Sequence, residues 1–320
     1  MRPVNNQSSG GTQSSVNPAG KKRVVVVVNK YWECDPVIGA LLNSKAKPAG
    51  LPWPQPPLNF PHERKNPATP QAPGVARPRL VFGLARSDVE IWCVSDLLEH
   101  LPDNPKYQSS SEQKMVRLPQ VFTQPADFVV AVGTAGYPRA YPLNGCVVVG
   151  ARVYMHDAKP GGANPDSKWA SPTLDTLLPR TVNGGDFGAL TRIAESAEPR
   201  FVAPPLNPAP RQLLLASYNY TALGSINVTD YDEYVWADRA TVTAFEGLGS
   251  PAEASSLETT HGLIRVASDP AKFVFLSGIT DHVGSFGFDV SPREYAQNMV
   301  AAHNAGVALA WMLPLIDARV

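Results

Sequence analysis

The chain has 320 residues, a formal net charge of zero and 43% hydrophobic residues. This length allows one large α/β domain or two smaller ones, with enough apolar residues for a large core. A neutral charge balance argues against partners bound through bulk positive charge, so neither a nucleic acid nor a membrane surface is expected. No apolar run approaches the roughly 20 residues that span a bilayer.

The N-terminal segment and the cysteines bear on cellular location. Residues 1–20 are polar and low in complexity, and they lack the apolar segment of a signal peptide. We expect a disordered tail here, one domain over residues 21–320 and a cytoplasmic location. Cys34, Cys93 and Cys146 are far apart and fit no metal-ligand spacing, which favours a reducing compartment and predicts no metal site.

The first elements alternate between strand and helix. Residues 23–29 contain five consecutive valines, which predict a central strand buried on both faces. A helix is expected over residues 36–44, with Pro36 in its first turn. Residues 45–78 contain ten prolines, a density that forbids regular structure and predicts an irregular insertion.

Strands resume after this insertion. Residues 79–85 and 89–98 have the pattern of strands, and so does 128–132, which is followed by a glycine-rich turn at 133–136. Residues 145–158 predict one or two further strands.

The second half of the chain begins with another insertion, over about residues 159–210, which is poor in periodic pattern. Residues 254–269 have a helical spacing of apolar residues, 272–276 read as a buried strand, and 291–316 as a long helix. The alternation predicts a single α/β domain with a mostly parallel central sheet flanked by helices in three layers, with proline-rich insertions.

Four stretches carry polar residues of chemical interest, and three of them follow a predicted strand. They read VVVVVNKYWECDPV, FVVAVGTAGYP, SSLETTHGLIRVA and FVFLSGITDHVG in chain order. In open α/β sheets, ligands bind at the carboxyl ends of the strands. These are therefore the places to look for a site.

Taken in order, these stretches resemble the purine nucleoside phosphorylase and methylthioadenosine/adenosylhomocysteine nucleosidase superfamily. The matching features are an acid after the first strand (Glu33), a Gly-Thr-Ala-Gly segment (133–136), a Leu-Glu pair before a helix (Glu258) and a Ser-x-x-x-Asp strand end (Ser277 and Asp281). The resemblance implies the superfamily's three-layer fold. It also implies a homo-oligomer, whether dimer, trimer or hexamer.

The resemblance implies an activity as well, namely cleavage of the N-glycosidic bond of a purine (deoxy)nucleoside or a related nucleoside. Such a reaction passes through a cation-like sugar and needs a proton donor for the departing base. A small-molecule nucleoside is therefore the expected partner. No cofactor is implied, and phosphate would be a co-substrate only if the protein is a phosphorylase.

Each acid has a role under this resemblance and an ordinary structural alternative. Asp281 suits the acid that protonates the base, but an aspartate beside a glycine is also a common turn residue. Glu258 suits the carboxylate that binds two ribose hydroxyls, but it could be a solvent-facing helix acid. Glu33 suits the base that orients water, but it could equally be a first-turn acid favoured by the helix dipole.

The remaining expected site residues follow from the resemblance alone. Thr134, with Gly133 and Ala135, is expected to contact the nucleophile or the ribose, and Ser277 the substrate. The base pocket is expected near Ser225, Ile226 and Asn227, where the sequence has no phenylalanine to stack on the base, so the base remains open. His261 and His282 are set aside here, because isolated histidines are more often structural than catalytic.

Water is favoured over phosphate as the nucleophile. The loop at residues 29–35 contains no arginine and carries two acids, which would repel an anion. Phosphorolysis, with Lys30, Arg139 or an arginine of a neighbouring subunit holding the anion, and a non-catalytic nucleoside-binding protein remain the alternatives. A Rossmann dehydrogenase is disfavoured, because residues 133–136 lack the G-x-G-x-x-G spacing.

Overall fold

The computed structural model describes about half of the chain. The described residues are 20–43, 45–48, 77–98, 111–137, 143–157, 195–205, 208–215, 218–223, 254–283 and 295–320. Nearly all of the expected tail, most of both insertions and the expected base-pocket residues at 225–227 lie outside these ranges. The predictions made for them therefore stay predictions.

Within the described residues, ten strands form one sheet. Its main path runs β2-β3-β1-β4-β10-β5-β7. The four central strands β3, β1, β4 and β10 are parallel to one another, whereas β2 pairs antiparallel with β3, and β5 pairs antiparallel with β10. In this order the bounds are Leu80–Gly83, Ser87–Cys93, Lys22–Val28, Phe128–Tyr137, Lys272–His282, Val147–Gly150 and Leu213–Leu215. Residues Val24–Val28 are fully buried, as expected for a central parallel strand.

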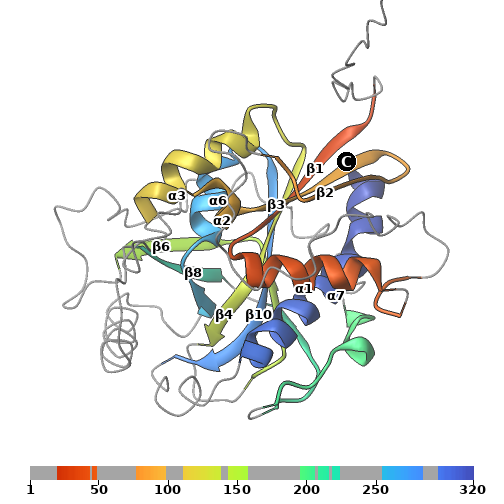
Figure 1. Ribbon diagram of the computed structural model, residues 1–320, viewed down its shortest axis with the longest axis vertical. Helices are drawn as coiled ribbons and strands as arrows, with labels where there is room; N and C mark the ends of the chain where they lie inside the picture. The colour runs from red at the N-terminus through yellow and green to blue at the C-terminus, as the bar shows by residue number, and fades with distance from the viewer. Residues whose placement is uncertain are drawn as a thin grey trace, which may run out of the picture.

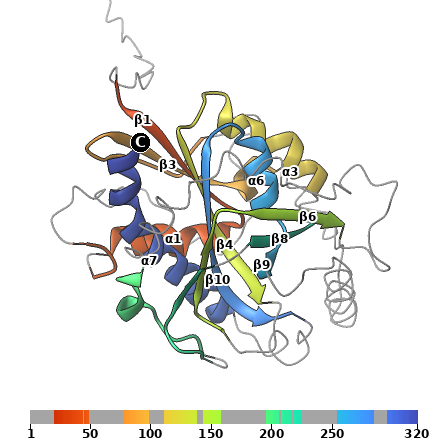
Figure 2. The same ribbon diagram turned by 180° about the vertical axis from the view of Figure 1, so that it is seen from behind.

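A second group of strands branches from the carboxyl-terminal half of β4. Its members are β6 (Val153–Asp157), β8 (Tyr218–Leu223) and β9 (Ala254–Glu258). β6 and β9 both run parallel to β8, and β9 pairs antiparallel with β4 where Leu257 lies opposite Gly136. Figure 2 shows this group beside the ends of β4 and β10. The branch is what brings β9, and Glu258 at its end, to β4.

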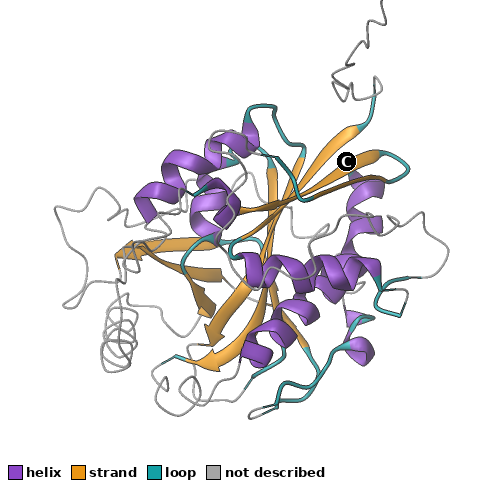
Figure 3. Cartoon of the chain, viewed as in Figure 1, coloured by secondary structure: helices purple, strands orange, loops and turns teal. Residues whose placement is uncertain are grey.

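Helices cover both faces of the main sheet (Figures 1 and 3). α1 (Tyr31–Leu42) and α7 (Tyr295–Arg319) pack together over the face formed by alternate residues such as Val24 and Val26. The opposite face, which includes Val25 and Val27, is covered by α2 (Val94–Leu97), α6 (His261–Ala267) and the 3-10 helix η1 (Leu118–Phe122), with α3 (Ser111–Arg117) beside them. The short η3 (Glu198–Arg200) precedes β7. The predicted three-layer α/β fold is confirmed.

Helix α7 is unusually apolar for its length. Its segment Gln297–Arg319 has a mean hydropathy of 1.5 and meets the length and composition of a membrane span, although the sequence suggested no such run. However, 67% of its most apolar window is buried inside the protein, against α1 and β10. The helix therefore acts as the core helix of this face.

Two predicted helix boundaries are wrong. Helix α1 begins at Tyr31 rather than 36, because Glu33 turns back to accept the Lys30 backbone amide, so that Pro36 lies inside the helix. Residues 254–269 are not one helix but a strand, β9, followed by α6. The apolar residues whose spacing suggested one helix belong to two elements. The side chain of Glu258 accepts the backbone amides of Thr260 and His261 and so fixes the start of α6.

Two predicted strand ends are also wrong. β4 continues through Gly133–Gly136, which were expected to form a turn, and β10 continues through Ser277 as far as His282. The reason at Gly136 is steric, since a Cβ there would lie 2.6 Å from the side chain of Val283. This glycine serves a close contact within the sheet and not a turn.

Candidate active site

Glu33 lies in the first turn of α1 and is 2% exposed. Its Oε2 accepts a hydrogen bond from the Lys30 backbone amide at 2.7 Å, and its Oε1 accepts the amide and the hydroxyl of Thr134 at 2.8 and 2.6 Å. Burial raises the pKa of Glu33, and these hydrogen bonds oppose that shift. The carboxylate thus joins α1 to β4 and contacts a second expected site residue, Thr134.

Glu258 ends β9 and is 8% exposed, so it is neither on a helix nor facing solvent. Its Oε2 accepts the backbone amide of Thr260, and its Oε1 accepts the amide of His261 at 2.9 Å. The hydroxyl of Thr221 lies 2.9 Å from the same Oε1. A carboxylate at the positive end of α6 is electrostatically favoured, so Glu258 also fixes the start of that helix.

Asp281 lies near the end of β10 and is partly exposed. The pairing of β10 with β4 places it opposite Gly136, after an irregularity in register between Ile279 and Asp281. The hydroxyl of Thr280 donates to its Oδ1. The carboxylate is therefore held at the carboxyl end of the sheet, in a strand and not in the loop that the sequence suggested.

The strand register gathers the three acids along β4. Gly136 lies opposite both Asp281 on β10 and Leu257 on β9, the residue before Glu258. Three residues earlier, Gly133 lies opposite Ser277, and Thr134 bonds to Glu33. At about 3.3 Å per residue, the two levels are about 10 Å apart along the strand. The register therefore places Asp281 and Glu258 near the Gly136 level of β4 and Glu33 near the Gly133 level, all at the carboxyl-terminal half of this strand.

A buried lysine, which the sequence gave no reason to single out, supports this arrangement. Lys114 of α3 is 2% exposed and donates to the Thr260 hydroxyl at 2.7 Å and to the carbonyl and hydroxyl of Thr259 at 3.1 Å. Burial lowers the pKa of Lys114 to about 7, with a further lowering by Lys30, while Glu258 and Glu33 act the other way. It holds the two residues that connect Glu258 to α6.

Behind Glu258 lies a network of buried polar side chains. The Asn219 amide donates to the Ser256 hydroxyl at 2.8 Å, and the Ser277 hydroxyl donates to Ser256 at 3.2 Å. The Thr221 hydroxyl accepts the Gly262 amide at 2.8 Å. Ser277, expected to touch substrate, is fully buried and has these neighbours instead of an opening to solvent. Its position nevertheless links β10 to the site.

No protein-family model matches the chain, and no curated protein matches it in sequence. Solved structures do match. A 5′-methylthioadenosine/S-adenosylhomocysteine nucleosidase from Colwellia psychrerythraea 34H aligns with 92% of this chain and 96% of its own, at 14% identity and a TM-score of 0.52. A methylthioadenosine phosphorylase from an Antarctic soil metagenomic library aligns with 93% and 88%, at 11% identity and a TM-score of 0.51.

A third match is the futalosine hydrolase of Helicobacter pylori strain 26695, with 13% identity, coverage of 92% and 97%, and a TM-score of 0.50. The fold is that of the nucleoside phosphorylase-like superfamily. This confirms the fold that the resemblance implied. At such low identity the likeness establishes the fold, and the chemistry has to be argued from the residues themselves.

The expected base pocket and Ala135 are the remaining parts of the predicted site. Ser225, Ile226 and Asn227, expected to form the base pocket, are outside the described residues. Ala135 is buried in the apolar core on the α6 side of the sheet, where it packs under the candidate site and has little access to a ligand. Among the described residues, no cluster of three or more histidine, cysteine, aspartate or glutamate side chains could hold a metal ion.

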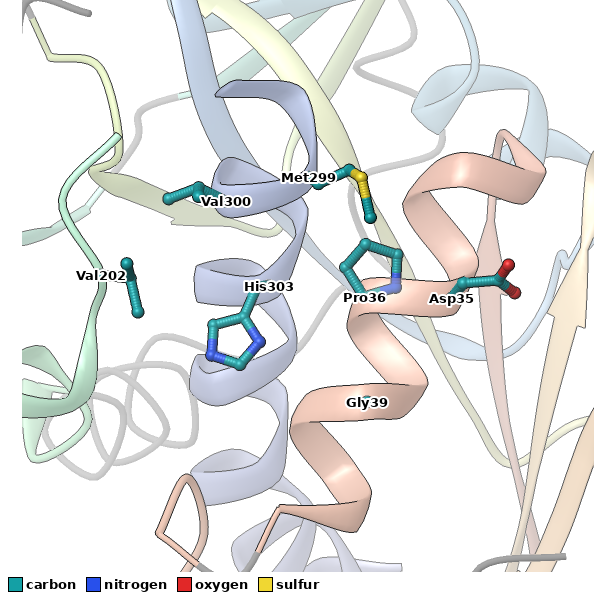
Figure 4. Close-up of a pocket in the computed structure, with 7 residues that line it drawn as sticks. All are labelled: Asp35, Pro36, Gly39, Val202, Met299, Val300 and His303. Carbon is teal, nitrogen blue, oxygen red and sulfur yellow. The ribbon is translucent and has the colours of Figure 1, made fainter. Parts of the chain in front are cut away.

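A separate hollow of about 420 Å³ lies on the outer side of α1 and α7 (Figure 4). Its walls are Asp35, Pro36, Gly39, Val202, Met299, Val300 and His303. None of the three acids of the candidate site lines it. The hollow is therefore separate from the candidate site at the strand ends.

Proposed function

We propose that this protein cleaves the N-glycosidic bond of a purine ribo- or deoxyribonucleoside, or of a related nucleoside, with water as the nucleophile. The observation that carries the proposal is the convergence of Glu33, Glu258 and Asp281 on the carboxyl-terminal half of β4. The fold supports it, because solved structures with the same fold are nucleosidases and a phosphorylase.

The roles follow from where each acid lies. Asp281 donates a proton to the purine as the bond from the sugar to the base breaks, so that the bonding electrons leave on a neutral base. Glu258 retains lone pairs beyond those used by Thr260 and His261, and these accept the ribose hydroxyls. Glu33, with Thr134, lies at the level where water would attack the anomeric carbon.

Phosphorolysis is the second candidate, since one of the similar structures is a phosphorylase. The described cations closest to the site are Lys30 and Lys114. Burial lowers the pKa of each of them, which weakens their hold on a dianion. The described strand ends offer no arginine fork of the kind that binds phosphate oxygens in pairs. Water remains the favoured nucleophile.

A nucleoside panel tests the proposal directly. Adenosine, inosine, 2′-deoxyadenosine and 5′-methylthioadenosine are incubated with the full-length protein, with and without phosphate, and the products are separated by chromatography. We expect free base and free sugar at a rate that phosphate does not change. Sugar 1-phosphate and strict phosphate dependence would establish phosphorolysis, and no cleavage of any nucleoside would refute the proposal.

The cytoplasmic location and the homo-oligomer stay predictions. Light scattering of the purified protein would test the second, and a monomeric mass would contradict it.

A further inference from the structure

The first residue of α6, His261, combines complete burial with an unused hydrogen-bonding atom. It is 0% exposed, and its Nε2 has no hydrogen-bond partner among the described residues. The ring packs against Phe275, with the centroids 5.6 Å apart. Buried polar atoms are nearly always satisfied in folded proteins, so an unsatisfied ring nitrogen calls for an explanation.

The unused Nε2 lies near Gly133 and Glu33, where the attacking water is expected. A Cβ built on Gly133 would have Glu33 Oε1 and His261 Nε2 as its nearest described neighbours, each at 3.5 Å. There is therefore room above Gly133 for a group the size of a methyl or a water, bordered by a carboxylate oxygen and a ring nitrogen. Two such polar partners are what a bound water needs.

The other side of the ring defines its protonation. His261 Nδ1 lies 3.5 Å from the Ser277 hydroxyl and 3.9 Å from Glu258 Oε1. An ionised carboxylate can only accept, and the Ser277 hydroxyl already donates to Ser256, so these neighbours favour the tautomer with the hydrogen on Nδ1 and the lone pair on Nε2. A carboxylate behind an imidazole also stabilises the cation that forms when the ring takes up a proton.

The charged groups around the ring agree with a neutral imidazole at rest. Burial lowers the pKa of His261, Lys114 of α3 adds to this lowering, and Glu258 of β9 opposes it. Glu33 of α1 faces the ring across Gly133. Arg265, also on α6, is turned toward Phe273 and Asp269.

Of the two candidates, Glu33 has the less available lone pairs. Its carboxylate already accepts three hydrogen bonds, two from Thr134 and one from Lys30, and each of them stabilises the charged form against taking up a proton. The Nε2 lone pair of His261 has no such competitor among the described residues.

We propose that His261 is a catalytic residue that accepts the proton of the attacking water, while Glu33 orients that water. The water oxygen bonds to the anomeric carbon, the bond to the base breaks with its electrons leaving on the base, and Asp281 supplies the proton that the base requires. The proton lost by water goes to His261 Nε2. This inference rests on the proposed nucleoside hydrolysis and reassigns the base expected at Glu33.

The kinetic test compares His261→Asn with Glu33→Gln and with a matched control, His303→Asn, on α7 away from the site. Asparagine keeps a donor near the Nδ1 position and removes Nε2. We expect His261→Asn to lower kcat about 10²–10³-fold with an unchanged melting temperature, and His303→Asn to leave kcat unchanged.

The pH profile separates a base from a merely structural residue. A base must be unprotonated, so kcat/KM of the wild type should rise with pH through a pKa below 6.5, the ordinary value for histidine. Glu33→Gln should keep that rise and His261→Asn should lose it. If His261→Asn retains kcat within threefold and keeps the rise, the base is not His261.

A third measurement does not depend on turnover. Long-range ¹H–¹⁵N spectra of the full-length protein report histidine tautomers, with His261→Asn identifying the signal. We expect the Nδ1–H tautomer. An Nε2–H tautomer would refute the base even if nucleosides are cleaved, whereas absence of cleavage by the wild type would refute the proposed function and the base together.

Discussion

The two faces of the central sheet are both buried, but they are built from different residues. The face under α1 and α7 is filled mostly by apolar side chains and by close backbone contacts, such as that of Gly278 with Ala301, and its buried Gln297 and Asn304 donate to backbone carbonyls. The face under α6 and α3 also buries Lys114, Glu258 and His261. Buried polar groups cost free energy unless they are fully paired. We therefore expect substitutions on the first face to act chiefly on stability, and the buried polar groups of the second face to serve the proposed chemistry together with Glu33 at the start of α1.

Removing the acid at the end of β10 should have the largest effect, and it should fall on activity alone. We expect Asp281→Asn to lower kcat about 10²–10⁴-fold, because an amide of the same shape has no acidic proton to give. The melting temperature should stay within a few degrees of the wild type.

The control for this change is Asp88→Asn. Asp88 forms a partly exposed ion pair with Lys21 near the opposite ends of the strands, 3.4 Å apart. Its loss should leave kcat intact and cost at most about 1 kcal/mol in stability. Normal turnover by a folded Asp281→Asn protein would remove this residue from the mechanism.

Disturbing the α7 face should affect stability instead. A Cβ on Gly278 of β10 would lie 2.1 Å from the backbone oxygen of Ala301. The helix must then move from the sheet, so we expect Gly278→Ala to lower the free energy of unfolding by about 3 kcal/mol or more. Urea unfolding followed by circular dichroism measures it.

Gly39 of α1 is the matched control, because a Cβ there meets nothing within 4 Å. Alanine is the better helix former, so Gly39→Ala should stabilise the protein by up to about 1 kcal/mol. Equal losses in the two variants would mean that the packing of α7 on β10 is not the source of the effect.

The same comparison shows how far the sequence could predict the fold. The buried parallel strands were visible as runs of branched apolar residues, such as Val24–Val28, because parallel strands are apolar on both faces. Strand ends were not predictable in the same way. Gly136 has the chemistry of a turn residue, and only the contact with Val283, far along the chain, explains it as part of a strand.

The candidate site was predictable to a similar extent. Glu33, Glu258 and Asp281 were singled out from their order along the chain and their resemblance to a known family, and the strand register is consistent with a shared site. Lys114 gave no signal, since its partners lie about 145 residues away. His261 was set aside because isolated histidines are more often structural, and its unpaired Nε2 is a property of the folded chain that the sequence does not show.

The lowered pKa of Lys114 predicts that the stability of the protein depends on pH through the sheet face under α6 and α3. Its pKa in the folded protein is about 7, below the ordinary 10.5 of the unfolded chain. Between these values the unfolded state binds more protons, so the free energy of unfolding should rise with pH, by up to about 1.4 kcal/mol per unit. The wild type should gain stability from pH 7 to pH 9 relative to Lys114→Met.

The control here is Lys22→Met, which removes a lysine that is half exposed and paired with Asp127 on the surface. Its stability difference from the wild type should not change over the same range. If the free energy of unfolding changes with pH equally in the wild type and in Lys114→Met, Lys114 keeps an ordinary pKa. The surroundings of Lys114 would then be more hydrated than the structure indicates.

The smallest effect concerns Glu258, which has both a structural and a proposed binding role. Glutamine has one acceptor oxygen, so Glu258→Gln loses part of the hydrogen bonding to the amides of Thr260 and His261 and should destabilise the protein by about 1 kcal/mol. That loss is common to all substrates. It cancels when kcat/KM for adenosine is divided by kcat/KM for 2′-deoxyadenosine in the same variant.

We expect this ratio to fall about fivefold in Glu258→Gln, because a carboxylate accepts two ribose hydroxyls and one of them is missing from the deoxyriboside. Glu90→Gln is the matched control, since Glu90 is a partly buried acid that pairs with Arg23 at 2.7 Å and touches no proposed substrate group. It should lower stability and leave the ratio unchanged. An unchanged ratio in Glu258→Gln as well would limit Glu258 to anchoring α6 and would remove it from the proposed ribose contacts.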